Sequence, residues 1–171
     1  MLPRVGRIRG RVLDAAGQPV AGAWVGDDDE ALLHSPTYVT NAEGVFAIAV
    51  PQKSIQLLAL AQGHAPSEVL ELEAGPGEEI ADIVLRLREP CRLEGRVVDA
   101  LGRPISGARV FVEELDFRSP EFCDEAGAFV LADMPPGTFQ LTAIRDDGER
   151  AMATAVLAPG LPSTVELRFT D

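Results

Sequence analysis

The chain has 171 residues and a formal net charge of −12, from 27 acidic and 15 basic side chains. So acidic a surface repels the phosphates of nucleic acids and of anionic membranes. With no apolar run near the ~20 residues that span a bilayer, the sequence predicts neither nucleic-acid binding nor membrane insertion. Hydrophobic residues make up 46% and aromatic residues only 5%, which indicates cores of Val, Leu, Ile and Ala and favours β-structure.

One sequence pattern occurs twice in succession. The matching pairs of segments are 8–25 with 93–110, 41–48 with 124–131, 55–59 with 139–143, and 84–87 with 165–169. Small shifts between these blocks indicate loops of different length, and a repeat that spans the whole chain indicates a duplicated domain. The sequence therefore predicts two domains, 1–88 and 89–171, with net charges of −5 (12 acids, 7 bases) and −7 (15 acids, 8 bases).

The first repeat begins with a predicted strand over residues 8–12, where apolar or small residues alternate with mostly charged ones. This period of two is typical of a strand with one buried face. Asp14–Gly17 predicts a turn, because Asp can bond the backbone ahead of it and Gly accepts a positive φ. Pro19 lacks an N–H and therefore belongs at the start of the returning strand, in which Ala23 and Val25 point inward.

Further along the repeat, Asn41–Gly44 predicts a second tight turn, followed by the inward pair Phe46 and Ile48. Glycines and prolines at 75–77 precede a last strand at 84–87. The second repeat carries the corresponding signals at 93–97, 99–102, 124–127, 129–131, 135–137 and 159–160. With roughly seven short strands per repeat and no long helix, the chain is expected to be all-β and to form two sandwiches.

The repeated motifs resemble a known family. They read G-x-V-x-D-x-x-G-x-P-V/I-x-G-A, then T/N-D/N-x-x-G-x-F, then P-P-G-x-F-x-L-x-A; the second copy has all three, and the first departs at 51–54. This pattern is similar to that of the carboxypeptidase regulatory-like domain. The resemblance implies two tandem seven-stranded Greek-key β-sandwiches of transthyretin-like (Ig-like) type, without catalytic activity, as found in secreted and envelope proteins.

No enzyme class related to this fold has its residues here, so we expect no catalytic site, no metal and no cofactor. His34 and His64 are too far apart in sequence to make a ligand pair for zinc. The hydroxyisourate hydrolases of similar fold end in a tyrosine-arginine-glycine-serine motif, whereas this chain ends with residues 167–171, Leu-Arg-Phe-Thr-Asp. The intradiol dioxygenases use paired Tyr and His ligands, and this chain has a single Tyr.

Two other groups of residues leave alternatives open. The densest acidic run consists of Asp27, Asp28, Asp29 and Glu30. It is either a calcium site, although it lacks the spaced acids of a calcium-binding loop, or a solvated acidic loop. Cys91 and Cys123 could form a disulfide, but the resemblance implies that they lie towards opposite ends of the domain, which favours separate thiols.

Trp24 and Phe111 are the candidate partner-binding residues. Both point outward by strand alternation, and an outward aromatic side chain either contacts a partner or covers its own sheet. The sequence thus predicts a structural or protein-interaction module, with a protein or the neighbouring domains of a longer chain as partner; the alternative is an accessory module that binds glycan or calcium. Because Met1 leads almost directly into the first strand, we expect a fragment of a longer protein, and the resemblance favours an extracellular or envelope location.

Overall fold

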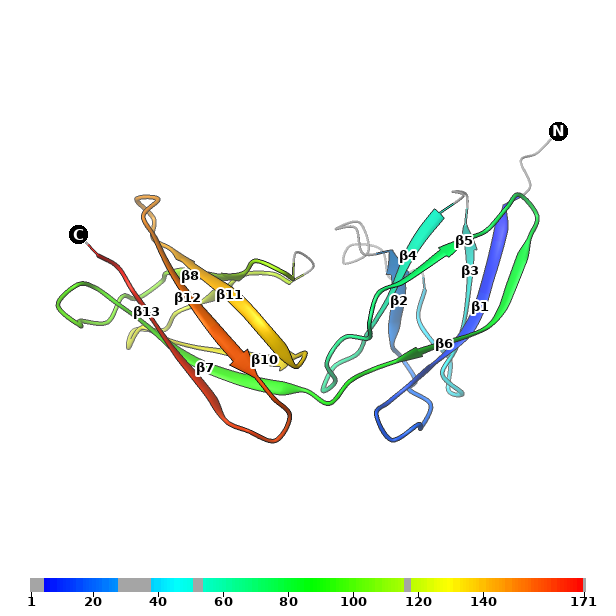
Figure 1. The fold of residues 1–171 in the computed structure, drawn as a ribbon, viewed down its shortest axis with the longest axis horizontal. Helices are drawn as coiled ribbons and strands as arrows, with labels where there is room; N and C mark the ends of the chain where they lie inside the picture. The colour runs from blue at the N-terminus through cyan, green and yellow to red at the C-terminus, as the bar shows by residue number, and fades with distance from the viewer. Residues whose placement is uncertain (1–4, 28–37, 51–53, 116–117, 171) are drawn as a thin grey trace. The chain divides into compact units, whose positions relative to one another are not determined.

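The computed structural model describes residues 5–27, 38–50, 54–115 and 118–170 (Figure 1). It divides into two compact units, Met1–Glu89 and Pro90–Asp171, each with its own hydrophobic core. The described residues form thirteen strands and no helix, which confirms the all-β prediction. Accordingly, that part of the chain contains no helix that could cross a membrane.

The first unit is a sandwich of two three-stranded sheets (Figure 1). Its strands are β1 (Gly6–Leu13), β2 (Trp24–Asp27), β3 (Val45–Val50), β4 (Ser54–Leu60), β5 (Leu70–Glu73) and β6 (Glu79–Arg86). In one sheet β1 is central, antiparallel to β3 and parallel to β6; in the other β4 is central, antiparallel to both β2 and β5. Alternate residues of both sheets meet in one core, where Ile8, Val12 and Leu57 are fully buried.

The second unit repeats this arrangement with one strand more. Its strands are β7 (Cys91–Val98), β8 (Arg109–Val112), β9 (Glu121–Phe122), β10 (Ala128–Met134), β11 (Gly137–Ile144), β12 (Arg150–Leu157) and β13 (Ser163–Arg168). The sheets have the orders β10-β7-β13 and β12-β11-β8-β9. The first-unit counterpart of β9 is a single bridge between Trp24 and Val39, so the described part of that unit has six strands rather than the expected seven.

A glycine in each central strand makes room for an aromatic ring. Gly10 lies opposite Phe46, and Gly95 lies opposite Phe129. A Cβ atom at Gly10 would lie 2.7 Å from Cζ of Phe46 and 2.3 Å from the carbonyl oxygen of Ile83, and a Cβ atom at Gly95 would lie 2.0 Å from Cζ of Phe129. Both rings therefore pack over their strand only because no side chain stands there.

The predicted turns form with the expected hydrogen bonds, in matching pairs. Oδ1 of Asp14 accepts the N–H of Gln18, and Oδ1 of Asp99 accepts the N–H of Arg103, both at 2.8 Å. The bond from Arg103 also holds the pKa of Asp99 below its usual value. At the second turn, Gly127 has a φ of 69°, and a Cβ atom there would lie 2.5 Å from the carbonyl oxygen of Val97, so only glycine fits without strain.

The two cysteines belong to one core. Cys91 and Cys123 are both buried in the second unit and are held as separate thiols rather than as a disulfide. Burial, together with the nearby carboxylates of Asp124 and Glu121, raises the pKa of the Cys123 thiol to about 11. Because the thiolate is the reactive form, Cys123 is expected to be nearly inert at neutral pH.

Replacing Gly10 by alanine should destabilise the first unit by about 1–3 kcal/mol, because the new methyl group has no free space. The sole tryptophan, Trp24, lies in this unit, so its fluorescence during urea unfolding measures the effect. Gly75→Ala is the matched control, because a Cβ atom there would meet only the side chain of Glu78. Equal losses for the two variants would contradict the packing role given to Gly10.

Labelling of Cys123 should be slow in the folded chain. In a Cys91→Ala variant, a disulfide reagent at pH 8 should react on the order of a hundredfold more slowly than with an exposed cysteine, since the raised pKa leaves little thiolate. The rate should recover in urea and rise as the pH approaches 11. Fast labelling of the native variant would show that the thiol is neither buried nor perturbed.

Candidate interaction surfaces

Trp24 lies on the outer face of the β2-β4-β5 sheet. Its side chain is 48% exposed, whereas the flanking Ala23 and Val25 are buried in the core, as strand alternation predicts. In register, Trp24 stands between Leu60 on β4 and Val39 on the other side. The three side chains form an apolar row across the sheet, which we call the tryptophan row.

The second unit has the equivalent row with different residues. Arg109 takes the place of Trp24, between Phe122 on β9 and Ile144 on β11. Phe122 is 61% exposed, so an aromatic side chain faces outward here too, but at the edge of the row. Equivalent strand positions in the two units therefore carry different exposed side chains.

Phe111, the other candidate, is only partly exposed. It stands opposite Thr142 on β11, and Thr142 in turn stands opposite Met152 on β12. Thr142 is 2% exposed although strand alternation points it away from the core. Met152, at 65% exposed, is therefore the more accessible member of this row, and Phe111 is partly withdrawn from solvent.

The hydroxyl group of Thr142 is buried and has no hydrogen-bond partner among the described residues. A buried hydroxyl without a partner costs stability. Thr142→Val should therefore stabilise the second unit by about 1 kcal/mol, measured by the protection of β11 amides against hydrogen exchange.

Thr40 supplies the matched control for this substitution. Its hydroxyl is also buried but accepts a hydrogen bond from the Ala23 N–H at 2.9 Å and donates one to the Val20 carbonyl at 2.7 Å. Thr40→Val should thus destabilise the first unit by about 1–3 kcal/mol, followed by Trp24 fluorescence. A loss of stability in both variants would mean that the Thr142 hydroxyl is satisfied after all.

An unpredicted feature lies on the outer face of β1. Arg7, Arg9 and Arg11 all point away from the core and are exposed; we call them the arginine stripe. Of the three, Arg9 forms an ion pair with Glu79 at 3.3 Å, with both side chains largely exposed. Arg7 and Arg11 form no ion pair with an acidic side chain of the described residues.

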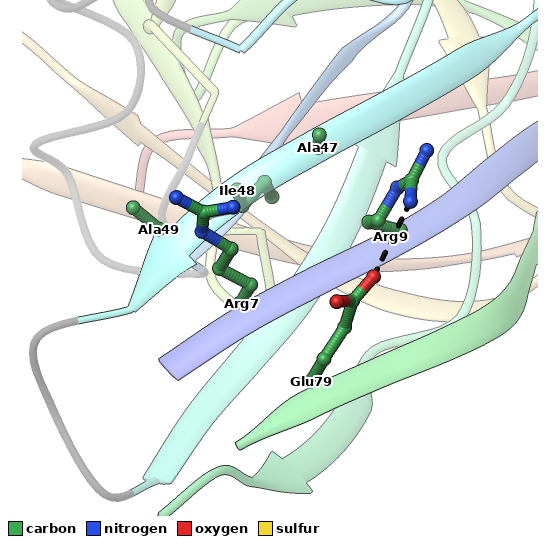
Figure 2. Close-up of a pocket in the computed structure, with 6 residues that line it drawn as sticks. All are labelled: Arg7, Arg9, Ala47, Ile48, Ala49 and Glu79. Atoms are coloured by element: carbon green, nitrogen blue, oxygen red, sulfur yellow. Dashed lines mark hydrogen bonds and ion pairs between the residues drawn. The ribbon is translucent and has the colours of Figure 1, made fainter. Parts of the chain in front are cut away.

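Two open hollows flank the arginine stripe. One, of about 470 Å³, is lined by Arg7, Arg9, Glu79 and the β3 residues 47–49 (Figure 2). Figure 2 shows Arg7 and Arg9 projecting from β1, with the short Ala47 and Ala49 on the neighbouring strand. The second hollow, of about 680 Å³, continues along β1 past Arg9 to Arg11 and is bordered by the β6 residues 81–84.

The same strand of the second unit carries an acid between its two outward arginines. β7 carries Arg92, Glu94 and Arg96 on its outer face, and Arg92 pairs with Glu94 at 3.0 Å. On the adjacent β13, Arg168 pairs with Glu166 at 2.7 Å. Because Glu94 occupies the position of Arg9, the second unit has no continuous row of positive charge.

Motif searching could not find the arginine stripe, because exposed charges at alternate positions are also typical of an ordinary solvent-facing strand. The available signal was that every outward position from 7 to 11 is arginine. In a chain with nearly twice as many acids as bases, such a run is unexpected by chance.

Residues that could ligate a metal ion form no cluster within the described ranges. No group of three or more His, Cys, Asp or Glu side chains there could hold a metal ion. His64 lies half-buried in the turn after β4. His34, Asp28, Asp29 and Glu30, and the side chain of Asp27, lie outside the part that the structure describes.

Comparison with protein families and solved structures gives the following matches. The family model of the "Carboxypeptidase regulatory-like domain" matches residues 7–86 and again residues 92–170. None of the curated proteins compared with the chain matches it significantly.

Solved structures that align with the chain include the Bacillus anthracis TIE protein, with 15% identity and a TM-score of 0.41, over 98% of this chain and 34% of that chain. A minor pilin of Streptococcus agalactiae aligns with 14% identity and a TM-score of 0.48, over 96% of each chain. The shaft pilin SpaA of Lactobacillus rhamnosus GG aligns with 11% identity and a TM-score of 0.36, over 99% of each chain. The chain spans about a third of the length of the first of these proteins.

Proposed function

Since the chain belongs to the carboxypeptidase regulatory-like domain family, with two consecutive copies, we propose that it is a non-catalytic structural module that binds a protein partner or neighbouring domains of a longer chain. In this role, the sandwich cores serve as rigid supports, and the outer sheet faces make the contacts. We further propose that this longer protein is secreted or belongs to the cell envelope.

The observation that carries the proposal is the contrast between interior and exterior of the two copies. Inward positions carry the same kind of residue in both copies. Examples are Ile8 and Leu93, and the glycine and phenylalanine that lie opposite each other on neighbouring strands in each unit. Several outward positions differ: Trp24 corresponds to Arg109 and Arg9 to Glu94, although the outward positions on either side of Arg9 are arginine in both copies. A shared scaffold with different outer faces is suited to binding rather than to a chemical reaction, because sites are carried on folds and are not fixed by them.

The tryptophan row is the proposed contact in the first unit. An exposed Trp flanked by apolar neighbours is typical of the residues that dominate binding energy in interfaces. Val39 is 44% exposed, so the row remains accessible in the chain alone. The equivalent Arg109 in the second unit lacks this apolar surface.

A photo-crosslinking amino acid at position 24, in the full chain expressed in its own cells, should give one discrete protein adduct. The same amino acid at position 109 occupies the equivalent strand position and should not give that adduct. Adducts are resolved by mass spectrometry. No adduct at position 24, or the same adduct at both positions, would count against the tryptophan row, and saturable binding of glycan or calcium by the chain would favour the accessory-module alternative.

A further inference from the structure

We propose that the arginine stripe binds an extended acidic segment of a partner protein, in which carboxylates on alternate residues meet Arg7, Arg9 and Arg11. This inference rests on the proposed function and specifies the chemistry of one partner. It concerns the outer face of the β3-β1-β6 sheet, whereas the tryptophan row lies on the other sheet of the same unit.

The stripe has positive charge that the described residues do not neutralise. Its one ion pair, Arg9 with Glu79, is exposed, and such pairs contribute little and exchange readily. Like charges on alternate residues of one strand repel each other, so an anionic ligand would relieve a repulsion that the free protein retains.

The distance between successive arginines of the stripe matches the side-chain spacing of a peptide in extended conformation. Alternate residues of a strand are about 7 Å apart, and a partner segment in extended conformation presents its own alternate side chains at the same interval. Each guanidinium group can take a carboxylate through two parallel hydrogen bonds. Three acids at every second position therefore match the three arginines in register.

The surroundings of the stripe allow a chain to lie over it. Ala47 and Ala49 on β3 and Ala81 on β6 are exposed and short, and the two hollows follow β1 with Arg9 common to both. Because β1 is hydrogen-bonded to β3 and β6 on its two sides, a partner cannot add to it as a strand. Recognition must occur through side chains on the face of the sheet.

The acids near the stripe favour a peptide over a continuous polyanion. Glu79 and Asp82 stand on β6, and Asp82 belongs to a bulge opposite Arg9, where it adopts a φ of 62°. The described outward residues of β3 are uncharged: Val45, Ala47 and Ala49. A peptide with a few spaced carboxylates can lie towards β3, away from these acids, whereas a polymer with charge at every unit is repelled by the acidic chain as a whole.

The test uses a fluorescent peptide in which Glu alternates with Thr, and a second peptide of the same composition with its Glu residues in one block. Fluorescence anisotropy at low ionic strength should show that the full chain binds the alternating peptide more tightly, and that added salt weakens the binding. Equal affinity for the two peptides would overturn the spacing argument. Tighter binding of a sulfated oligosaccharide or of polyphosphate would assign the stripe to a polyanion instead.

Arg9→Glu is the decisive variant, because it gives β1 the Arg-Glu-Arg pattern that β7 carries in the same fold. It should keep the unfolding transition of the parent chain and reduce peptide affinity by about tenfold or more. Arg96→Glu, the control at the position equivalent to Arg11, should leave affinity unchanged. Unchanged affinity in Arg9→Glu, or an equal loss in both variants, would exclude the stripe as the site.

Self-association is a separate outcome. If the chain forms a dimer that Arg9→Glu dissociates in sedimentation experiments, the occupant is a second copy and the proposal is wrong. The crosslinking experiment at position 24 tests for a partner at the β2-β4-β5 sheet, not at the stripe. Failure of the peptide to bind would therefore leave the proposed function intact. Conversely, peptide binding without a crosslink at position 24 would support the stripe and count against the tryptophan row.

Discussion

The contact between a strand glycine and the phenylalanine opposite it determines much of this structure. Gly10 with Phe46 and Gly95 with Phe129 occupy the same place in the two units, at the centre of the strand that pairs on both sides. Each ring fills the space that a side chain would take, so glycine and ring depend on each other. The pair also fixes the register, because a slip by one residue would place the ring opposite a charged residue of the central strand and exchange the two faces of the strand.

A fixed register separates the requirements of the two faces. In β1 and β7 the inward residues are apolar or glycine and are buried, with Leu13 partly so, whereas the outward residues Arg7, Arg9, Arg11, Arg92, Glu94 and Arg96 are exposed on the opposite face, so they can change with little effect on the core. The difference between Arg9 and Glu94, next to identical glycines, illustrates this independence. Duplication has thus given two copies of one scaffold whose exposed faces differ in charge and in apolar surface.

Alternation and turn chemistry predicted which way the side chains point but not how well they are covered. The outward direction of Trp24 and the turn at Asp14 follow from local sequence alone, and both are present. The burial of Thr142, in contrast, does not follow from alternation; its cross-strand neighbours, Phe111 and Met152, are brought beside it only by strand pairing. Sequence reasoning therefore located Phe111 on the outer face but could not tell that it is only partly exposed there.

The charge of the whole chain and the charge of the stripe act over different distances. The net charge of −12 repels an acidic partner, but at physiological ionic strength charges more than about 8 Å away are largely screened. Binding at the stripe must then depend on direct contacts between guanidinium and carboxylate groups, and these contacts form together only when the acids have the spacing of alternate strand residues. The pairing itself thus decides which partners bind: it favours sparsely charged segments of matching period over densely charged polymers, whose additional charges meet the acids beside the stripe, Glu79 and Asp82.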